Sequence, residues 1–320
     1  MSGIIKDKCL LAICIPTYNR SSILDESLTS LIPLVKGLDI VIYVIDNGST
    51  DNTEDIVARF NGNGIRYIKN DENIGGDLNI LKSYKVASGI AEYVCVLGDS
   101  YRFKKDLHSM IQLLSSKDIN LLILNREGVC FSDVTTSRYY YNSNEILQEL
   151  GGGLDLVGCL LIKSEAIKQE NYMPYVWSNF IHTGMVFHYL STINNIKCYF
   201  LKEQVLYHTH IDKTSTSWYR NSLEIFGKTW MLVIMSLPGM LSIDAKLKCI
   251  KKHDHYTHLF SLKRILLLRK NKLITYRDVR QYKHYIPFVT DTSLALFYLS
   301  CFIPSFFLKI SFYIWKKLKP

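Results

Sequence analysis

Polar side chains that could bind a small ligand follow three separate apolar runs. They occupy residues 16–20, 46–51 and 98–102. Two of these segments carry carboxylates, Asp46 and Asp99, which accept strong hydrogen bonds from N–H or hydroxyl groups when ionised. Ligands of open parallel sheets bind beyond the carboxyl ends of the strands, so we expect the three segments to meet at one sheet edge.

The elements that must position these segments alternate along the first 125 residues. Short continuous apolar runs are typical of strands buried on both faces. Three helix patterns lie between them. The first begins at Ser22 and ends at Pro33, the second ends near Phe60, and the third ends near Ser88. This alternation predicts an α/β fold with a mostly parallel sheet and helices on both faces. The expected strands are residues 10–15, 40–45, 65–68, 93–97 and 121–124.

Composition and missing motifs exclude several classes of protein. With 320 residues and 48% hydrophobic content, the chain can bury a large core. Eight cysteines without a C-x-x-C pair predict reduced thiols in a cytosolic setting, and no secretory signal is expected. The absence of G-x-x-x-x-G-K-[ST], G-x-G-x-x-G and G-x-S-x-G argues against a P-loop ATPase, a dinucleotide dehydrogenase and an α/β-hydrolase.

The net charge of +9 is unevenly distributed. Residues 1–240 hold 22 Lys and Arg against 25 Asp and Glu, whereas residues 241–320 hold 16 against 4. We therefore expect a near-neutral domain over residues 1–240 and a basic helical region over residues 241–320. Such a basic region indicates an anionic partner, either a phospholipid surface or nucleic acid.

Four blocks of the sequence form a recognisable pattern. They are residues 13–20 (ICIPTYNR), 44–51 (VIDNGSTD), 70–76 (NDENIGG) and 96–99 (VLGD). Together they resemble family 2 glycosyltransferases, which have the Rossmann-like GT-A fold. The resemblance covers roughly residues 9–230, and the segment 73–80 (NIGGDLNI) is similar to O-antigen transferases of the abequosyltransferase type. It implies an enzyme that transfers a hexosyl or deoxyhexosyl group from a nucleotide-diphosphate sugar.

The resemblance also implies a nucleotide-binding set at the strand ends. Asp46 would hydrogen-bond the base or ribose, and residues 16–18 would lie along the nucleotide. The alternative is ordinary turn chemistry, for which Asn-Gly and Ser-Thr-Asp are well suited. The predicted nucleotide-binding residues are Pro16, Thr17, Tyr18, Arg20, Asp46, Asn47, Asp77 and Gly98.

A divalent metal is the cofactor that the resemblance implies. Asp99 matches the first acid of the family's D-x-D motif, where Mg²⁺ or Mn²⁺ neutralises the leaving nucleoside diphosphate. Here Tyr101 stands in place of the second acid. We therefore expect weakened metal binding by Asp99, with His208 or His210 as the compensating ligand; an exposed strand end is the alternative role for these histidines.

Inverting members of the family use an acid at the start of a later helix as the general base. The matching segment, residues 177–184, contains no acid. His182 is the first substitute, because a neutral imidazole can accept a proton, and Asp155 is the second. A structural role for His182 beside apolar residues is the alternative.

The C-terminal region predicts an association with membranes. Residues 246–283 mix Lys and Arg with apolar residues, which is typical of a basic amphipathic helix on anionic lipid, and His253 is expected at the surface. Residues 293–315 are long enough to span a bilayer, but Pro304 and Lys309 interrupt them, which favours an in-plane or re-entrant anchor. A pair of core helices is the alternative. No nucleic-acid module is recognised.

These observations predict a nucleotide-sugar-dependent glycosyltransferase of bacterial surface polysaccharide synthesis, such as O-antigen or capsule. Its acceptor would be a lipid-linked oligosaccharide, and its location the cytoplasmic face of the inner membrane, peripheral or monotopic. The alternative is a non-catalytic scaffold that binds nucleotide sugar or glycan, because the second D-x-D acid and the acidic base are missing.

Overall fold

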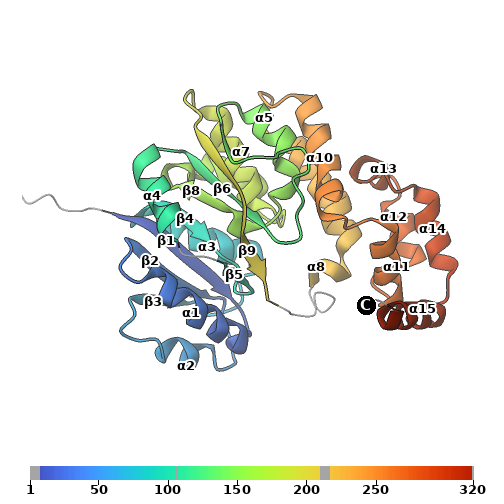
Figure 1. Cartoon of the computed structure of the whole chain (residues 1–320), viewed down its shortest axis with the longest axis horizontal. Helices are drawn as coiled ribbons and strands as arrows, with labels where there is room; N and C mark the ends of the chain where they lie inside the picture. Colours follow the sequence, from blue (N-terminus) through green and yellow to red (C-terminus); the bar gives the residue numbers. More distant parts are fainter. Residues whose placement is uncertain (1–7, 105–106, 210–216, 319–320) are drawn as a thin grey trace, which may run out of the picture. The chain divides into compact units, whose positions relative to one another are not determined.

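A computed structural model describes residues 8–104, 107–209 and 217–318 of the chain (Figure 1). It divides into two compact units. The first comprises Met1–Ile146 with Leu154–Thr209, and the second comprises Leu147–Gly153 with His210–Pro320. The division at residue 210 lies earlier in the chain than the charge shift near residue 240.

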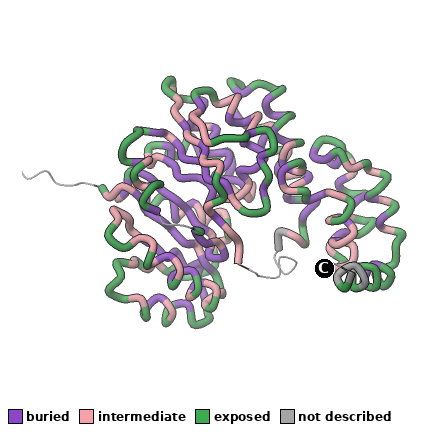
Figure 2. Tube along the Cα trace, in the orientation of Figure 1, coloured by how far each residue is buried: buried purple, intermediate pink, exposed green. Residues whose placement is uncertain are grey.

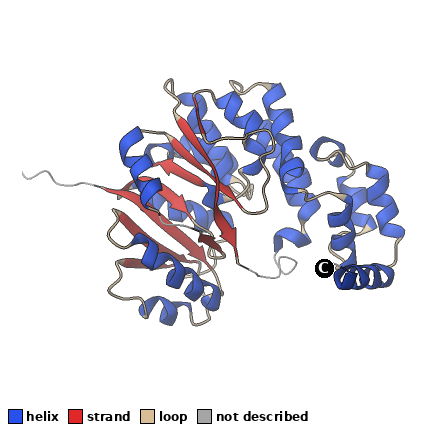
Figure 3. Ribbon diagram, viewed as in Figure 1, coloured by secondary structure: helices blue, strands red, loops and turns tan. Residues whose placement is uncertain are grey.

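The first unit is an α/β structure around a nine-stranded sheet of order β3-β2-β1-β4-β8-β6-β9-β5, with β7 also paired to β9 (Figure 3). Its strands are β1 (Cys9–Thr17), β2 (Ile40–Asp46), β3 (Ile65–Lys69), β4 (Ala91–Val96), β5 (Tyr101–Phe103), β6 (Leu121–Arg126), β7 (Arg138–Tyr140), β8 (Leu160–Lys163) and β9 (Cys198–His208). Its helices are α1 (Ser21–Val35), α2 (Thr53–Ala58), α3 (Gly76–Ser88), α4 (His108–Lys117), α5 (Ser143–Glu149, which ends in the second unit), α6 (Gln169–Tyr172) and α7 (Ile181–Thr192).

The sheet is mostly parallel, as the sequence pattern predicts. β1 pairs in parallel with both β2 and β4, and β2 with β3. β8 is antiparallel to both β4 and β6, so β6 and its parallel neighbour β9 keep the direction of β4. Only β5, β7 and β8 run the other way. In the mixed half of the sheet, the apolar run at residues 121–124 predicted β6, whereas β5, β7, β8 and β9 were not predicted.

Strand β1 lies inside the sheet between β2 and β4 and is largely buried on both faces, as Figure 2 shows. Leu11, Ile13 and Ile15 pack with apolar residues of α1 and α4. On the opposite face the Cys14 thiol donates to the Ser83 carbonyl of α3. Successive side chains of a strand alternate between faces, so helices cover both sides of the sheet and exclude water from it.

Helix α1 departs from the sequence prediction at both ends. It continues past Pro33 to Val35, because proline in the last turn costs one backbone hydrogen bond without blocking the final residues. Its first turn has no cap from its own side chains. Instead Asp51, from the loop after β2, accepts from the Ser21 N–H at 2.9 Å. A hydrogen bond to a residue 30 positions away therefore caps the helix, in place of the local start signal predicted at Ser22.

The second unit is helical in its described part (Figure 3). Large buried residues such as Trp230, Phe260 and Phe297 form its core. His253, expected at the surface, is only 2% exposed and lies against the rings of Phe226 and Trp230, so that prediction was wrong. Its elements are α8 (Ser217–Arg220), a π-helix (Leu223–Thr229), α9 (Trp230–Ser236), α10 (Ile243–Thr257), α11 (Leu262–Lys270), α12 (Tyr276–Tyr282), α13 (Ile286–Val289), α14 (Leu294–Phe302) and α15 (Ser305–Leu318).

The basic segment 246–283 forms three helices, α10, α11 and α12, instead of one. The apolar face of α11 is turned into the protein, since Ile265 and Leu268 are fully buried. Among the described helices, none is by itself long and apolar enough to cross a bilayer. The pair Leu294–Phe302 and Ser305–Ser311 meets that test only when the two are taken together, and it is bent by 97°.

Candidate functional site

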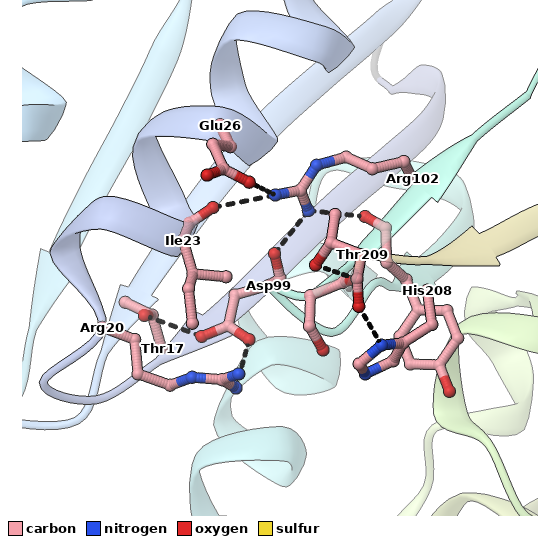
Figure 4. A network of polar contacts seen from close by, with 10 residues as sticks. Thr17, Arg20, Ile23, Glu26, Asp99, Arg102, His208 and Thr209 are labelled. Atoms are coloured by element: carbon pink, nitrogen blue, oxygen red, sulfur yellow. Dashed lines mark hydrogen bonds and ion pairs between the residues drawn. The ribbon is translucent and has the colours of Figure 1, made fainter. Parts of the chain in front are cut away.

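Asp99 is the centre of a polar network at the carboxyl edge of the sheet (Figure 4). Thr17 Oγ1 donates to one carboxylate oxygen at 3.1 Å, and Arg20 Nη1 donates to the other at 2.6 Å. Asp99 is only 3% exposed. Burial raises its pKa, while the Arg20 charge and the Thr17 hydrogen bond oppose that rise. The loops after β1 and β4 are therefore joined through one buried carboxylate.

Arg102 fixes the Asp99 loop from behind and is almost completely buried. Its guanidinium donates to the backbone carbonyls of Asp99 at 2.5 Å and Ile23 at 2.9 Å, and it lies 3.7 Å from Glu26 (Figure 4). Burial lowers the pKa of Arg102, and the charge of Glu26 opposes that shift. Arg102 thus ties the loop after β4 to the start of α1.

The loop after β2 is joined to the loop after β1 by hydrogen bonds from backbone N–H groups to side-chain oxygens. The Asn19 N–H donates to Ser49 Oγ at 2.9 Å, and the Thr50 N–H donates to Asn19 Oδ1 at 2.8 Å. The Asp99 contacts to Thr17 and Arg20 complete the connection. The three polar loops therefore meet at one edge, as the sequence predicts.

Asp46 is fully buried, and both its carboxylate oxygens have protein partners. Oδ1 accepts from the Ser49 N–H at 2.9 Å, and Oδ2 accepts from the Tyr67 hydroxyl at 2.6 Å. Gly48 completes the turn at φ 77°, where an added Cβ would lie 2.8 Å from the backbone of Glu72. In this conformation the Asp46 carboxylate stabilises the turn after β2. A nucleotide would hydrogen-bond Oδ2 only by displacing the Tyr67 hydroxyl.

A cluster of amides lies beside Asp46. Asn47 Nδ2 donates to Asn73 Oδ1 at 2.9 Å, and Asn47 Oδ1 accepts from Asn70 Nδ2 at 2.9 Å and from the Ile74 N–H at 3.0 Å. Lys82 donates to Asn70 Oδ1 at 2.6 Å. Our prediction named only Asn47. Asn70 directly follows β3, so the same strand-end reasoning would have found it.

Asp77, predicted to bind nucleotide, sits in the first turn of α3 and holds the loop that leads into α7. Its carboxylate accepts from the Asn179 N–H at 2.8 Å. Trp177 and Asn179 both have left-handed backbone conformations, at φ 73° and 63°. Burial raises the pKa of Asp77, while hydrogen bonds from these two backbone groups lower it. The structure thus brings an acid to the segment where the sequence contains none.

His182 and Asp155, the predicted bases, are internal groups. His182 is 2% exposed; its Nε2 donates to the Asp155 carbonyl at 3.2 Å, and its Nδ1 has no hydrogen-bond partner. Burial lowers the pKa of His182 to about 4, although Asp155 opposes the shift. The Asp155 carboxylate is paired with Arg126 at 2.6 Å. Burial alone would lower the pKa of Arg126, but the Asp155 charge raises it instead.

The described residues do not fit a preformed metal site. They contain no group of three or more His, Cys, Asp and Glu that could hold an ion. The Asp99 carboxylate is turned toward Thr17 and Arg20, whereas His208 donates to the Thr209 carbonyl and packs edge-on against Tyr101 (Figure 4). His210 lies outside the described residues. Asp99 and His208 therefore offer separate single ligands.

The remaining predicted residues lie at the strand ends. Pro16 and Thr17 end β1, Tyr18 follows with 40% of its surface exposed, and Gly98 follows β4. The Arg20 side chain is 34% exposed, so its guanidinium reaches solvent beside Asp99. Arg20 and Tyr18 are therefore two groups of this edge that a ligand can contact directly.

Sequence comparisons match this part of the chain. Residues 12–163 match the model of the family described as glycosyl transferase family 2. The abequosyltransferase RfbV of Salmonella typhimurium is 30% identical over 213 residues, which are 59% of this chain and 62% of that protein. The validoxylamine A glucosyltransferase of Streptomyces hygroscopicus is 41% identical over 61 residues, 19% of this chain and 14% of that protein. The chain thus spans less than two thirds of the length of these relatives.

Solved structures show the same fold. The TarS 1–349 structure from S. aureus has a TM-score of 0.55 at 13% identity and covers 91% of this chain and 90% of its own. The mannosyltransferase PcManGT from Pyrobaculum calidifontis, in complex with GDP-Man and Mn²⁺, has a TM-score of 0.56 at 12% identity and covers 98% of this chain and 82% of its own. At these identities the similarity concerns the fold.

The mixed sheet, its helices on both faces and the polar loops at its carboxyl edge define a GT-A fold. Residues 12–163, which supply most of β1 and all of β2 to β8, match the glycosyl transferase family 2 model. Over that part and beyond it, the chain is similar to an abequosyltransferase.

Proposed function

We propose that the chain transfers a hexosyl or deoxyhexosyl group from a nucleotide-diphosphate sugar to a lipid-linked oligosaccharide in bacterial surface polysaccharide synthesis. The observation that carries this proposal is the network in which Thr17 and Arg20 hold the Asp99 carboxylate at the meeting point of the three loops. The similarity to an abequosyltransferase supports the O-antigen context.

The donor would lie along the loop after β1. The exposed ring of Tyr18 offers an apolar face to the nucleotide base. Arg20 has N–H groups beyond the one that Asp99 accepts, and a guanidinium binds phosphate oxygens through paired N–H donors. Asp99 would hold Arg20 in place for the diphosphate, so Asp99 acts as a positioning residue and Arg20 as the phosphate ligand.

The transfer step needs an acceptor for one proton. The acceptor hydroxyl oxygen forms a bond to the anomeric carbon, the bond from that carbon to the diphosphate breaks, and the nucleoside diphosphate leaves with the electron pair. We assign the released proton to Asp77, whose partly exposed carboxylate lies beside the loop into α7. Its raised pKa brings it toward the range of a useful base. His182, the first base predicted from the sequence, remains the alternative acceptor of this proton, and a variant of its own tests it.

Metal binding by Asp99, His208 and His210 stays a prediction. The similar fold of PcManGT is known in complex with Mn²⁺. In this chain a metal ion would have to compete with Arg20 for the Asp99 carboxylate, because the two cations would weaken each other's binding to it. The proton and phosphate roles above are assigned to side chains of this chain and do not depend on a metal.

The proposed location is the cytoplasmic face of the bacterial inner membrane. Helices α14 and α15 each bury some apolar side chains and expose other large ones to solvent. Phe302 is 73% exposed, Phe306 66% and Tyr313 61%. Apolar patches of this kind mark interaction surfaces, and the neighbouring Lys309 and Lys317 complement an anionic leaflet.

Release of nucleoside diphosphate tests the function. Purified protein is incubated with CDP-, GDP-, UDP- or dTDP-sugars and a bacterial glycolipid extract, with and without Mn²⁺. We expect one donor class to give acceptor-dependent release that is strongly reduced by Arg20→Gln. Nucleotide-sugar binding without release under any acceptor would favour the scaffold function instead, which the internally satisfied carboxylates of Asp46 and Asp99 would then explain.

A further inference from the structure

A cavity of about 620 Å³ in the second unit is lined by positive charge. Its cations come from three elements: Arg220 from α8, Lys270 and Lys272 from the end of α11, and Lys309 from α15. Asp278 is the acid in the lining. Side chains from distant parts of the sequence therefore converge on one hollow, unlike the charges on a single solvated helix face.

The acid in this cavity, Asp278, is already hydrogen-bonded within its own helix cap. Asp278 forms a capping box at the start of α12, accepting from the Thr275 N–H at 2.8 Å and from its hydroxyl at 2.7 Å. In the described part of the chain, Arg220, Lys272 and Lys309 form no ion pair with any acid. An anion from outside the chain would be the natural counter-charge for these cations.

Lys272 occupies a position that normally requires glycine. Its N–H donates to the Arg269 carbonyl at 2.9 Å, and the Leu273 N–H donates to the Leu268 carbonyl at 2.8 Å. These two bonds form a Schellman motif that ends α11, with Lys272 at the left-handed position, φ 57°. A side chain there costs about 1 kcal/mol relative to glycine. The structure keeps a lysine where local conformation disfavours it.

The turn that carries Lys270 and Lys272 is held rigidly. Arg269 donates to the carbonyls of Ile274 at 2.5 Å, Ser300 at 3.2 Å and Cys301 at 3.0 Å. It thereby ties the end of α11 to α14. The Arg264 guanidinium of α11 lies over the ring of Tyr219, which precedes Arg220. Preorganised cations lose less entropy when they bind a ligand.

The cavity adjoins the exposed apolar face of α15. Lys309 lines the cavity and precedes Ile310, which is 40% exposed, and Phe306 lies one turn earlier with 66% exposed. Leu308 is buried, so this helix turns one face to the core and an aromatic face outward. A ligand that combines a negative headgroup with acyl chains would satisfy both the cations and the apolar face.

We propose that the cavity bounded by Arg220, Lys270, Lys272 and Lys309 binds the phosphate of a membrane lipid headgroup. The aromatic face of α15 would rest among the acyl chains while the phosphate enters the cavity. This site lies wholly within the second unit, and its ligand is distinct from the nucleotide sugar of the transferase site. Its test measures binding and is independent of turnover.

Vesicle co-sedimentation of the full chain tests the proposal. The two probes are phosphatidylcholine vesicles and vesicles containing added phosphatidylglycerol. The unaltered chain should bind the anionic vesicles more tightly, and the preference should weaken at high salt. Lys272→Gln with Lys309→Gln should reduce the binding constant for anionic vesicles about fivefold for each lysine removed, and leave binding to phosphatidylcholine nearly unchanged. A matched control, Lys36→Gln with Lys117→Gln, removes two exposed lysines from the first unit.

Lys272→Gly separates binding from folding. It relieves the left-handed conformation, so it should maintain or raise the melting temperature while it weakens anionic-vesicle binding. The proposal is overturned if Lys272→Gly or the double variant binds anionic vesicles like the unaltered chain, or if the control pair weakens binding equally. Competition by soluble glycerol phosphate as strong as that by vesicles would point to a free phosphate ligand and overturn the lipid assignment.

Discussion

Arg20 Nη1 lies 2.6 Å from Asp99 Oδ1 at the carboxyl edge of the sheet. The Arg20 side chain is about one-third exposed, whereas the Asp99 side chain is buried. This asymmetry gives the two residues different roles, because only Arg20 can meet a ligand without a rearrangement. Asp99 supplies the fixed negative charge that orients it.

Arg20→Gln should therefore damage donor use more than folding. We expect kcat/KM for the nucleotide sugar to fall about 100-fold, the typical loss when one preorganised donor to a developing negative charge is removed. Arg20→Lys keeps the charge without the paired N–H geometry and should recover part of the activity. Steady-state kinetics with donor varied would measure both, and an unchanged kcat/KM in Arg20→Gln would exclude Arg20 as the phosphate ligand.

The same ion pair predicts a competition with metal. Because Arg20 and a divalent cation would both need the Asp99 carboxylate, removing the guanidinium should strengthen Mn²⁺ binding in the absence of nucleotide. Calorimetric titration should give tighter Mn²⁺ binding to Arg20→Gln than to the unaltered chain, and the gain should vanish in Arg20→Gln with Asp99→Asn. Equal affinity in all three proteins would show that Asp99 is not a metal ligand.

Asp77 should control the acidic limb of the pH–rate profile. A carboxylate base works only when deprotonated, so kcat should fall as the pH drops below its pKa, which burial raises above the ordinary value for an aspartate. Asp77→Asn should lower kcat by about 100-fold or more and remove that limb. If Asp77→Asn keeps the limb and His182→Asn removes it, the proton goes to His182 instead.

The strand-end site could be predicted from the sequence because it depends on topology. Parallel strands such as β1, β2 and β4 place their carboxyl ends at one edge whatever the exact register. Residues at or just beyond the ends of these strands, including Asp46 and Asp99, therefore had to come together. The same reasoning could not give their hydrogen-bond partners, since Tyr67 reaches Asp46 from a strand 21 positions away.

Contacts between distant segments account for the errors. His253 sits among charged residues of α10, so local composition placed it at the surface, but Phe226 and Trp230 from earlier helices enclose it. The link between Asp77 and the Asn179 N–H spans 102 residues. No local pattern encodes such a contact, and the absence of an acid in residues 177–184 concealed it.

The Tyr67 hydroxyl should contribute to the stability of the Asp46 turn. Tyr67→Phe removes the donor at 2.6 Å and leaves a buried carboxylate oxygen without its partner. We expect the free energy of unfolding to fall by about 1–3 kcal/mol, measurable by urea denaturation. Tyr43→Phe is a control, because the Tyr43 hydroxyl accepts from the surface residue Arg66 and not from a buried acid. Equal losses in both variants would argue against a special role for the Asp46 contact.

His182 should make the fold sensitive to acid. Its pKa is lowered to about 4 by burial, below the value of about 6.5 expected in the unfolded chain. Between these two values the unfolded state binds more protons, so stability from the neutral imidazole is complete above pH 6.5 and is lost as the pH falls toward 4. The loss should approach about 3 kcal/mol at the acidic end.

Unfolding of His182→Asn across this range should show a shallower pH dependence than the unaltered chain, whereas replacement of the exposed His255 should leave the dependence intact. Parallel curves for His182→Asn and the unaltered chain would mean that burial does not lower the pKa of His182 in the folded protein.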